Sequence, residues 1–538
     1  MTTKTLQARR DARRITTSKQ ETQAIAFEDE KDQSGRLTGR QLVELSDGRI
    51  MPTQQSPRPR RTPTGRAALL SGASDSRADL ILANPTSYRL LDDMEYGTRF
   101  PDGGRPQMFP NQLWSILFTL QNAIPTQAGL VRHLSRADVL EKVTSQLSAC
   151  RCDLPEADQI LIDRWMQEGR RIPDRTTICK MFRSLEERGL DLGDKLMQSG
   201  TDLASHLGRY DTMKGTSDTK SVVIGDGTVL RAACDSTALE TFDPKLNTVT
   251  QRRVDELAIV CHEGSGDHVY GSKLVAIWSP SNDRHGTVCL GADLVGSPAP
   301  AHEADTATDL TLAARRMLER HNLSPHNLVY DRAVNRKHQE KLNMHQMIVT
   351  TRANSDQGES ANRNRSTQHQ YIGTVTPECK REFRLFAINK TLTVQQMGVG
   401  GDHQYLEMKH SVRTTRSKGK TYTYSDHRFQ CTNPACGHHT VSIPWNGRKT
   451  FNHRGKNRMD PIDDAQYEKI LTYLQPHVPG TQDHKVIYAL RERTETMHSI
   501  IDALLPFKRL QRWGLKSKRA FLFGYLLGYN LFVEQAHS

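Results

Sequence analysis

The spacing of apolar residues changes along the chain, and each change marks a different kind of predicted structure. Residues 1–85 are mostly polar, and the stretch MPTQQSPRPRRTPTGR (51–66) is rich in proline, threonine and arginine without an acid. Such a composition offers little apolar surface to bury. The pattern therefore predicts a disordered basic arm over 1–85, with an inert linker as the alternative.

From 86 to 215, apolar residues recur at helical spacing. The segment LPEADQILIDRWMQEGRRIPDRTTICKMFRSLEERGL (154–190) indicates two helices joined by a short turn. A helix-turn-helix presents its second helix to the major groove of DNA, and Lys180 and Arg183 stand on this second helix. We expect a helical DNA-binding region over 86–215, although any helical hairpin with a basic face gives the same pattern.

Strand and helix patterns alternate from 216 to 355. Three apolar, β-branched runs come first: SVVIGDGTVLRAA, HVYGSKLVAIWSP and GTVCLGADLVG. A helix, a strand, a helix and a strand follow: HEADTATDLTLAARRMLERH, HNLVYDRAV, NRKHQEKLNMH and QMIVTTRAN. The first three strands can pair as a meander, and a helical crossover then returns the chain to a parallel strand. The order predicts an α/β fold with a mixed sheet.

The helical pattern disappears from 356 to 462, where runs such as EFRLFAINKTLTV and KTYTYSDHRFQC alternate polar and apolar residues. We expect a β-rich insertion here, and a return to helix over 463–538. The longest apolar run, AFLFGYLLGYNLFV (520–533), is shorter than the roughly 20 residues that span a bilayer. It therefore predicts a buried helix and no membrane partner.

Composition narrows the class of partner. The chain has 538 residues, which suggests about three domains of roughly 150 residues each. Its 74 Lys and Arg residues exceed its 61 Asp and Glu residues, for a net charge of +13. This excess indicates a polyanionic partner, most simply nucleic acid. The nine cysteines form no regular framework, so we expect a reducing compartment.

Two acids in predicted strands are candidate metal ligands because of their positions. Asp226 lies between Gly225 and Gly227, and these glycines would leave room for a metal and a phosphate backbone. Asp331 ends a short apolar strand, and an acid at the carboxyl end of a strand faces the usual crevice of an open α/β sheet. For each acid taken alone, a solvated surface residue is the alternative.

A third acid, Glu495, lies on a predicted helix away from its apolar stripe, together with Tyr488 and Arg491. Three carboxylates from a sheet and a facing helix suit two divalent ions, and Mg²⁺ prefers such oxygen ligands. Two ions could activate a water or a 3′-hydroxyl for phosphoryl transfer. The rival acids are Asp235 for the first position and Glu492 for the third.

Four stretches carry a resemblance to a known family: VVIGDGTVLRA, YGSKLVAI, LVYDRAVN, and YALRERTETMHSI with the later FKRLQRWGLKSKRAFLFGYLLGYNL. They resemble the bacterial insertion-sequence DDE transposases, over roughly 220 to 535. The most specific part is the Y-x2-R-x3-E signature, which Tyr488, Arg491 and Glu495 match. The chain departs from the family at Asp502, where a Lys is common.

The resemblance implies an RNase H-like mixed-sheet catalytic core, interrupted by the β-rich insertion and preceded by the helical DNA-binding region. It implies that Asp226, Asp331 and Glu495 are the catalytic, metal-binding triad for Mg²⁺ or Mn²⁺, and that Tyr488 and Arg491 contact DNA. The expected activity is cleavage at transposon ends and direct joining of the 3′ end to target DNA. The expected partners are double-stranded DNA and a second copy in a synaptic dimer, in the bacterial cytoplasm at the nucleoid.

Two alternative functions share these features: one is enzymatic and the other is DNA binding without catalysis. An RNase H-like nuclease that cuts without joining needs the same acids. A non-catalytic DNA-binding protein derived from a transposase would be expected to lack one of the catalytic acids, whereas all three candidates are present.

A run of bases follows Glu495 in the segment PFKRLQRWGLKSKR. It has no acid and one Trp, and its bases would hold the DNA backbone while Glu495 holds a metal at the scissile phosphate. A solvated basic loop is the alternative. The bases are Lys508, Arg509, Arg512, Lys516, Lys518 and Arg519.

The segment HRFQCTNPACGHH offers ligands of another kind. His427, Cys431, Cys436 and either His438 or His439 could close a tetrahedral Zn²⁺ site that stabilises the insertion. Two cysteines make a weaker pattern than four, and a His-rich turn with two free thiols is the alternative.

Overall fold

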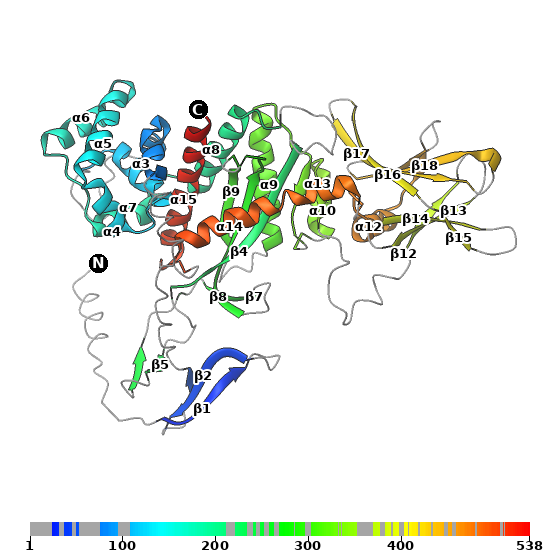
Figure 1. Cartoon of the computed structure of the whole chain (residues 1–538), viewed down its shortest axis with the longest axis horizontal. Helices are drawn as coiled ribbons and strands as arrows, with labels where there is room; N and C mark the ends of the chain where they lie inside the picture. The colour runs from blue at the N-terminus through cyan, green and yellow to red at the C-terminus, as the bar shows by residue number, and fades with distance from the viewer. Residues whose placement is uncertain are drawn as a thin grey trace.

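The parts of the molecule follow one another along its long axis. The computed structural model has a helical region at one end, a mixed sheet with covering helices in the middle, and a β-rich part at the other end (Figure 1). It describes residues 24–31, 37–45, 50–52, 76–94, 108–210, 221–233, 240–243, 248–251, 255, 258–262, 268–283, 286–295, 303–331, 333–334, 336–351, 370–376, 382–388, 391–397, 403–406, 408–417, 420–431, 434–445, 450–453, 459–478, 481–505, 509–510 and 512–538.

Strands and a helix stand within 1–85, where the composition predicts disorder. The strands β1 (Ala24–Lys31), β2 (Leu37–Leu45) and β3 (Ile50–Pro52) form an antiparallel sheet, and a helix covers 76–83. The prediction of a disordered arm is therefore wrong for these ranges. Short alternating runs such as LVEL can pair with one another even in a polar context. The rest of the expected arm lies outside the described residues.

The region after this arm is helical, as its apolar spacing predicts. Prolines and polar caps separate the helices: Asp174, for example, accepts a hydrogen bond from the Thr177 N–H and begins the second helix of the predicted helix-turn-helix. The helices are α3 (Asn111–Thr119), α4 (Gln127–Leu134), α5 (Ala137–Cys150), α6 (Glu156–Gln167), α7 (Arg175–Ser184) and α8 (Leu192–His206).

The apolar run near the C-terminus forms the buried helix α15 (Leu515–His537), which packs on α3, α7 and α8 and on the sheet. Figure 1 shows this red helix between the helical region and the sheet. Two side chains fix it: Asn122 donates to the Tyr525 carbonyl at 2.9 Å, and Asn530 bonds both backbone groups of Cys289 at 2.9 Å. Among the described residues, no helix is long and apolar enough to cross a membrane.

Gly528 allows α15 to approach α3 closely. A Cβ atom at this position would lie 2.0 Å from the Thr119 carbonyl oxygen. We expect Gly528→Ala to lower the free energy of unfolding by about 1–3 kcal/mol, because two backbones would have to separate. Urea unfolding measures this, with Lys516→Ala on the exposed face of α15 as the control. Equal midpoints for the two variants would contradict the close packing.

The middle of the molecule is a mixed sheet with the predicted pairing. β4 pairs antiparallel with β8, β8 pairs antiparallel with β9, and β10 returns parallel to β4. The predicted meander and crossover are therefore confirmed, and the fold is mixed α/β. The elements are β4 (Val222–Arg231), β7 (Ile259–His262), β8 (His268–Ser279), β9 (Val288–Val295), α9 (Glu303–Arg320), β10 (Asn327–Val329), α10 (Arg336–Met344) and β11 (Ile348–Thr350), besides the separate hairpin of β5 (Glu240–Asp243) and β6 (Thr248–Gln251).

Two antiparallel sheets form the β-rich part and share one apolar cluster. The first contains β12 (Gln370–Val375), β13 (Phe383–Ile388), β14 (Thr391–Met397) and β15 (His403–Leu406). The second contains β16 (Met408–Ser417), β17 (Lys420–Gln430), β18 (His438–Pro444), β19 (Thr450–His453) and β20 (Met459–Pro461). The chain then returns to helix in α12 (Asp464–Tyr473), α13 (Gln482–Ala489) and α14 (Glu492–Leu504).

Buried histidines lie around the junction of sheet and insertion. His477 is fully buried and lies 3.1 Å from the Asn327 amide nitrogen, which donates to the neutral ring. Burial lowers the pKa of His477 to about 3 and the pKa of His326 to about 4. Both rings are therefore neutral in the folded protein at pH 7, whereas the unfolded chain protonates them below pH 6.5.

Stability should consequently fall as the pH drops below about 6.5, because the unfolded chain binds more protons. Between pH 7 and 5 each of the two rings is expected to cost roughly 2 kcal/mol. Urea unfolding of His477→Gln should show a flatter pH dependence, since Gln can still accept from Asn327. The control is His345→Gln at an exposed position; an identical slope in all three proteins would contradict the prediction.

Candidate functional site

Asp226 and Asp331 lie side by side because of the strand register. Val329 of β10 pairs with Ile224 of β4 in parallel, and each acid follows its paired residue by two positions. The two carboxylates therefore reach the same edge of the sheet. Each offers an oxygen to a cluster in which all ligand atoms lie within 4.8 Å of one another.

The third member of this cluster is Glu303, at the start of α9. The sequence pattern does not single out Glu303, because an acid in the first turn of a helix is usually explained by the helix dipole. Its carboxylate forms an ion pair with Lys273 and accepts from the Tyr330 hydroxyl at 3.0 Å. Burial raises the pKa of Glu303, while Lys273 opposes this shift.

Gly227 makes room for Glu303. A Cβ atom at position 227 would lie 2.3 Å from Glu303 Oε1 and 2.8 Å from Lys273 Cε. The sequence predicted room here for a metal and a phosphate backbone, whereas the structure shows that this space admits the side chains of Glu303 and Lys273.

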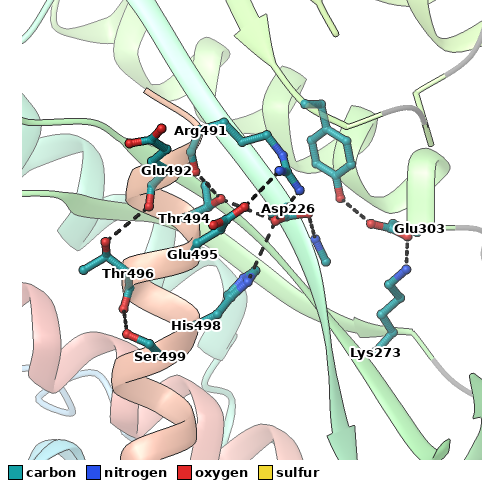
Figure 2. A network of polar contacts seen from close by, with 12 residues as sticks. Asp226, Lys273, Glu303, Arg491, Glu492, Thr494, Glu495, Thr496, His498 and Ser499 are labelled. Atoms are coloured by element: carbon teal, nitrogen blue, oxygen red, sulfur yellow. Dashed lines mark hydrogen bonds and ion pairs between the residues drawn. The ribbon is translucent and has the colours of Figure 1, made fainter. Parts of the chain in front are cut away.

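Asp226 is buried and has three donors besides this cluster. Its Oδ1 accepts from the Gly227 N–H at 2.9 Å, and its Oδ2 accepts from Arg491 Nη2 at 3.0 Å and from Thr494 Oγ1 at 3.4 Å. Burial raises the pKa of Asp226, whereas the nearby guanidinium of Arg491 lowers it. Figure 2 shows Thr494 and His498 of α14, and Arg491 at its N-cap, reaching Asp226. His498 Nδ1 lies 3.9 Å from Asp226 Oδ2.

The structure does not bring Glu495 into the carboxylate cluster. Its side chain is 64% exposed and accepts from Arg491 Nη1 at 3.2 Å. The same guanidinium donates to Asp226, so Arg491 stands between the two carboxylates (Figure 2). Of the rival acids, Glu492 is exposed, and Asp235 lies outside the described residues.

Three other predicted DNA contacts, outside the basic run, differ in their surroundings. Tyr488 is half-buried and stacks on His484, with ring centroids 5.5 Å apart and an angle of 6° between the rings. Lys180 and Arg183 are exposed on α7, so this face is open to a partner.

Several bases of the run after Glu495 have partners within the chain, and the burial of Lys518 corrects the prediction that this residue holds DNA. Lys518 is buried and pairs with buried Asp255, and Arg519 bonds Glu186 and Asp293 at 2.8 Å. Partners that lie far away in sequence explain the difference. Of the others, Arg512 is held by Gln127 Oε1 and the Pro125 carbonyl, Lys516 pairs with Glu187, Arg509 forms a backbone bridge with Arg231, and Lys508 lies outside the described residues.

The candidate zinc ligands are brought together only in part. Atoms of Cys431, Cys436 and His439 lie within 4.8 Å of one another. His427 is not part of this group. It is buried four residues earlier on β17, where its Nε2 lies 3.1 Å from Ser425 Oγ. Four residues of a strand span about 13 Å, so the predicted fourth ligand is wrong for this geometry.

Two comparisons with known proteins found no match. No family model matches the chain. No curated protein matches it either. Function is therefore inferred from the site itself.

Proposed function

We propose that this chain is a DDE-type DNA transposase with an RNase H-like core. The observation that carries the proposal is the parallel register that sets Asp226 and Asp331 side by side, with Asp226 facing α14. The order of parts supports it as well: the β-rich insertion separates Asp331 from Arg491 and Glu495, as in the family that the sequence resembles. The net charge of +13 suits a nucleic-acid substrate.

The donor set fits divalent ions that prefer oxygen. Three carboxylates within 4.8 Å, two of them from a rigid sheet edge, are ligands that Mg²⁺ and Mn²⁺ take. We propose that Asp226, Asp331 and Glu303 hold one such ion. Ions held here would lower the pKa of a bound water and stabilise the leaving oxygen of an in-line displacement.

Among the side chains that contact Asp226, Arg491 has the central role in the proposed mechanism. Its guanidinium now neutralises Asp226 and Glu495 together, at 3.0 and 3.2 Å. A DNA phosphate would compete for the same donors, because an arginine binds phosphate in a bidentate manner. We propose that Arg491 turns to the phosphate of the substrate and so frees Glu495 to serve as the third catalytic acid.

The neighbours of Asp226 keep it in place during this exchange. The Gly227 N–H and the Thr494 hydroxyl orient its carboxylate from two sides. Glu303 is oriented in the same way by Lys273 and Tyr330. Exposed Lys180 and Arg183 of α7 would hold DNA outside the site, and joining of two ends requires two copies of the chain.

The experiment uses the full chain and linear DNA that contains its own coding sequence with the flanking genomic DNA, in Mg²⁺ or Mn²⁺. We expect breaks that leave 3′-hydroxyls near the ends of this element and products in which these ends are joined to other DNA. Breaks without joined products would support the nuclease instead. No breaks in either ion would contradict the proposal.

A further inference from the structure

The turn between β17 and β18 gathers three metal-binding side chains outside the acidic site. Cys431 follows β17, Cys436 ends the 3-10 turn Pro434–Cys436, and His439 lies on β18. The Cys431 N–H donates to the Gly437 carbonyl at 3.0 Å, and Gly437 has a φ of 69°, which closes the turn. The ligand atoms of the three side chains lie within 4.8 Å of one another.

We propose that Cys431, Cys436 and His439 form a structural zinc site. Two thiols and one imidazole are the ligand types of tetrahedral Zn²⁺, with bonds of about 2.3 Å to sulfur and 2.0–2.1 Å to nitrogen. Ligand atoms in such a tetrahedron stand roughly 3.3–3.8 Å apart, so small side-chain rotations suffice. Mg²⁺, which the acidic site suits, does not prefer these ligands. In the described part of the chain these three side chains supply the protein ligands, and a water would complete the tetrahedron.

The site lies at a seam between the two sheets of the insertion. The Phe383 ring of the first sheet lies 5.0 Å from the ring of Phe429 and 5.9 Å from the ring of His439, both of the second sheet. Cys431 is buried in the same apolar cluster, and Cys436 packs against it. An ion bound here would hold the end of β17 and the start of β18 together. These strand ends belong to the second sheet, which packs against Phe383 of the first sheet. The role is therefore structural, and the inference does not depend on the proposed function.

The direct test is zinc content. The full chain, purified without chelator, is expected to contain one zinc ion per chain by mass spectrometry of the metal. Cys436→Ser and His439→Ala should lose it. Two matched controls should retain it: Cys152→Ser at an exposed thiol elsewhere, and His438→Ala at the exposed neighbour on β18.

A second measurement covers the case in which the variants fail to fold. Chelation of the wild-type protein should raise hydrogen exchange in β17, β18 and β13 and leave β4 and β8 unchanged. Substitution by Co²⁺ should give a thiolate charge-transfer band that Cys436→Ser weakens. Wild-type protein without zinc, full zinc in Cys436→Ser, or a disulfide between Cys431 and Cys436 would overturn the proposal.

Discussion

Asp226→Asn is expected to reduce DNA cleavage by about 10³-fold or more, which corresponds to several kcal/mol of transition-state stabilisation. The amide keeps the size of the carboxylate but carries no charge for a divalent ion. Asp226 also lies at the centre of the site, since it belongs to the carboxylate cluster and bonds Arg491. Rates of strand breakage in Mg²⁺ measure the effect.

The matched control is Asp309→Asn on α9, whose carboxylate is 65% exposed and pairs with Lys341. This variant should cleave at the wild-type rate. Thermal unfolding of both variants separates a catalytic effect from a folding defect. A folded Asp226→Asn protein that cleaves normally would remove Asp226 from the reaction.

Lys518→Met should have the largest effect on stability, lowering the free energy of unfolding by about 3–5 kcal/mol. The Lys518 ammonium lies 2.7 Å from Asp255 and 2.7 Å from Ser272 Oγ. The side chains of Lys518 and Asp255 are 1% and 0% exposed. Removal of the cation would leave a buried carboxylate without its counter-ion. Urea unfolding measures the loss.

Lys516→Met serves as the control on the same helix. Its ion pair with Glu187 is exposed, so the change should cost at most about 1 kcal/mol. DNA affinity adds a second comparison. If the basic run held DNA, the two variants would weaken binding equally and leave stability alike, and this result would contradict the structural role of Lys518.

The sequence predicted the sheet because its strands are strongly apolar and their order restricts the topology. Asp226 and Asp331 stand out in the sequence by their positions in predicted strands and by the family resemblance, whereas the parallel register that brings them together is a finding of the structure. The RNase H-like assignment stays a prediction, because pairing alone defines a mixed α/β sheet and not a family.

The remaining site could not be predicted for physical reasons. Glu303 enters the cluster through tertiary packing of α9, which local pattern does not encode. The basic run looked unpaired because its acids, among them Asp255 and Asp293, are far away in sequence. By contrast, strand geometry alone shows that His427 does not join the zinc ligands, since four residues along a strand place it too far from Cys431.

The central claim is that Asp226 ligates the ion on which DNA cleavage depends, and Asp226→Cys tests it most directly. A thiolate is a poor ligand for Mg²⁺ but a better one for softer ions such as Mn²⁺ or Cd²⁺. We expect the variant to be inactive in Mg²⁺ and to regain cleavage when Mn²⁺ or Cd²⁺ is supplied, while Asp309→Cys cleaves in Mg²⁺. Full activity of Asp226→Cys in Mg²⁺, or no recovery with either softer ion in a folded protein, would contradict the account.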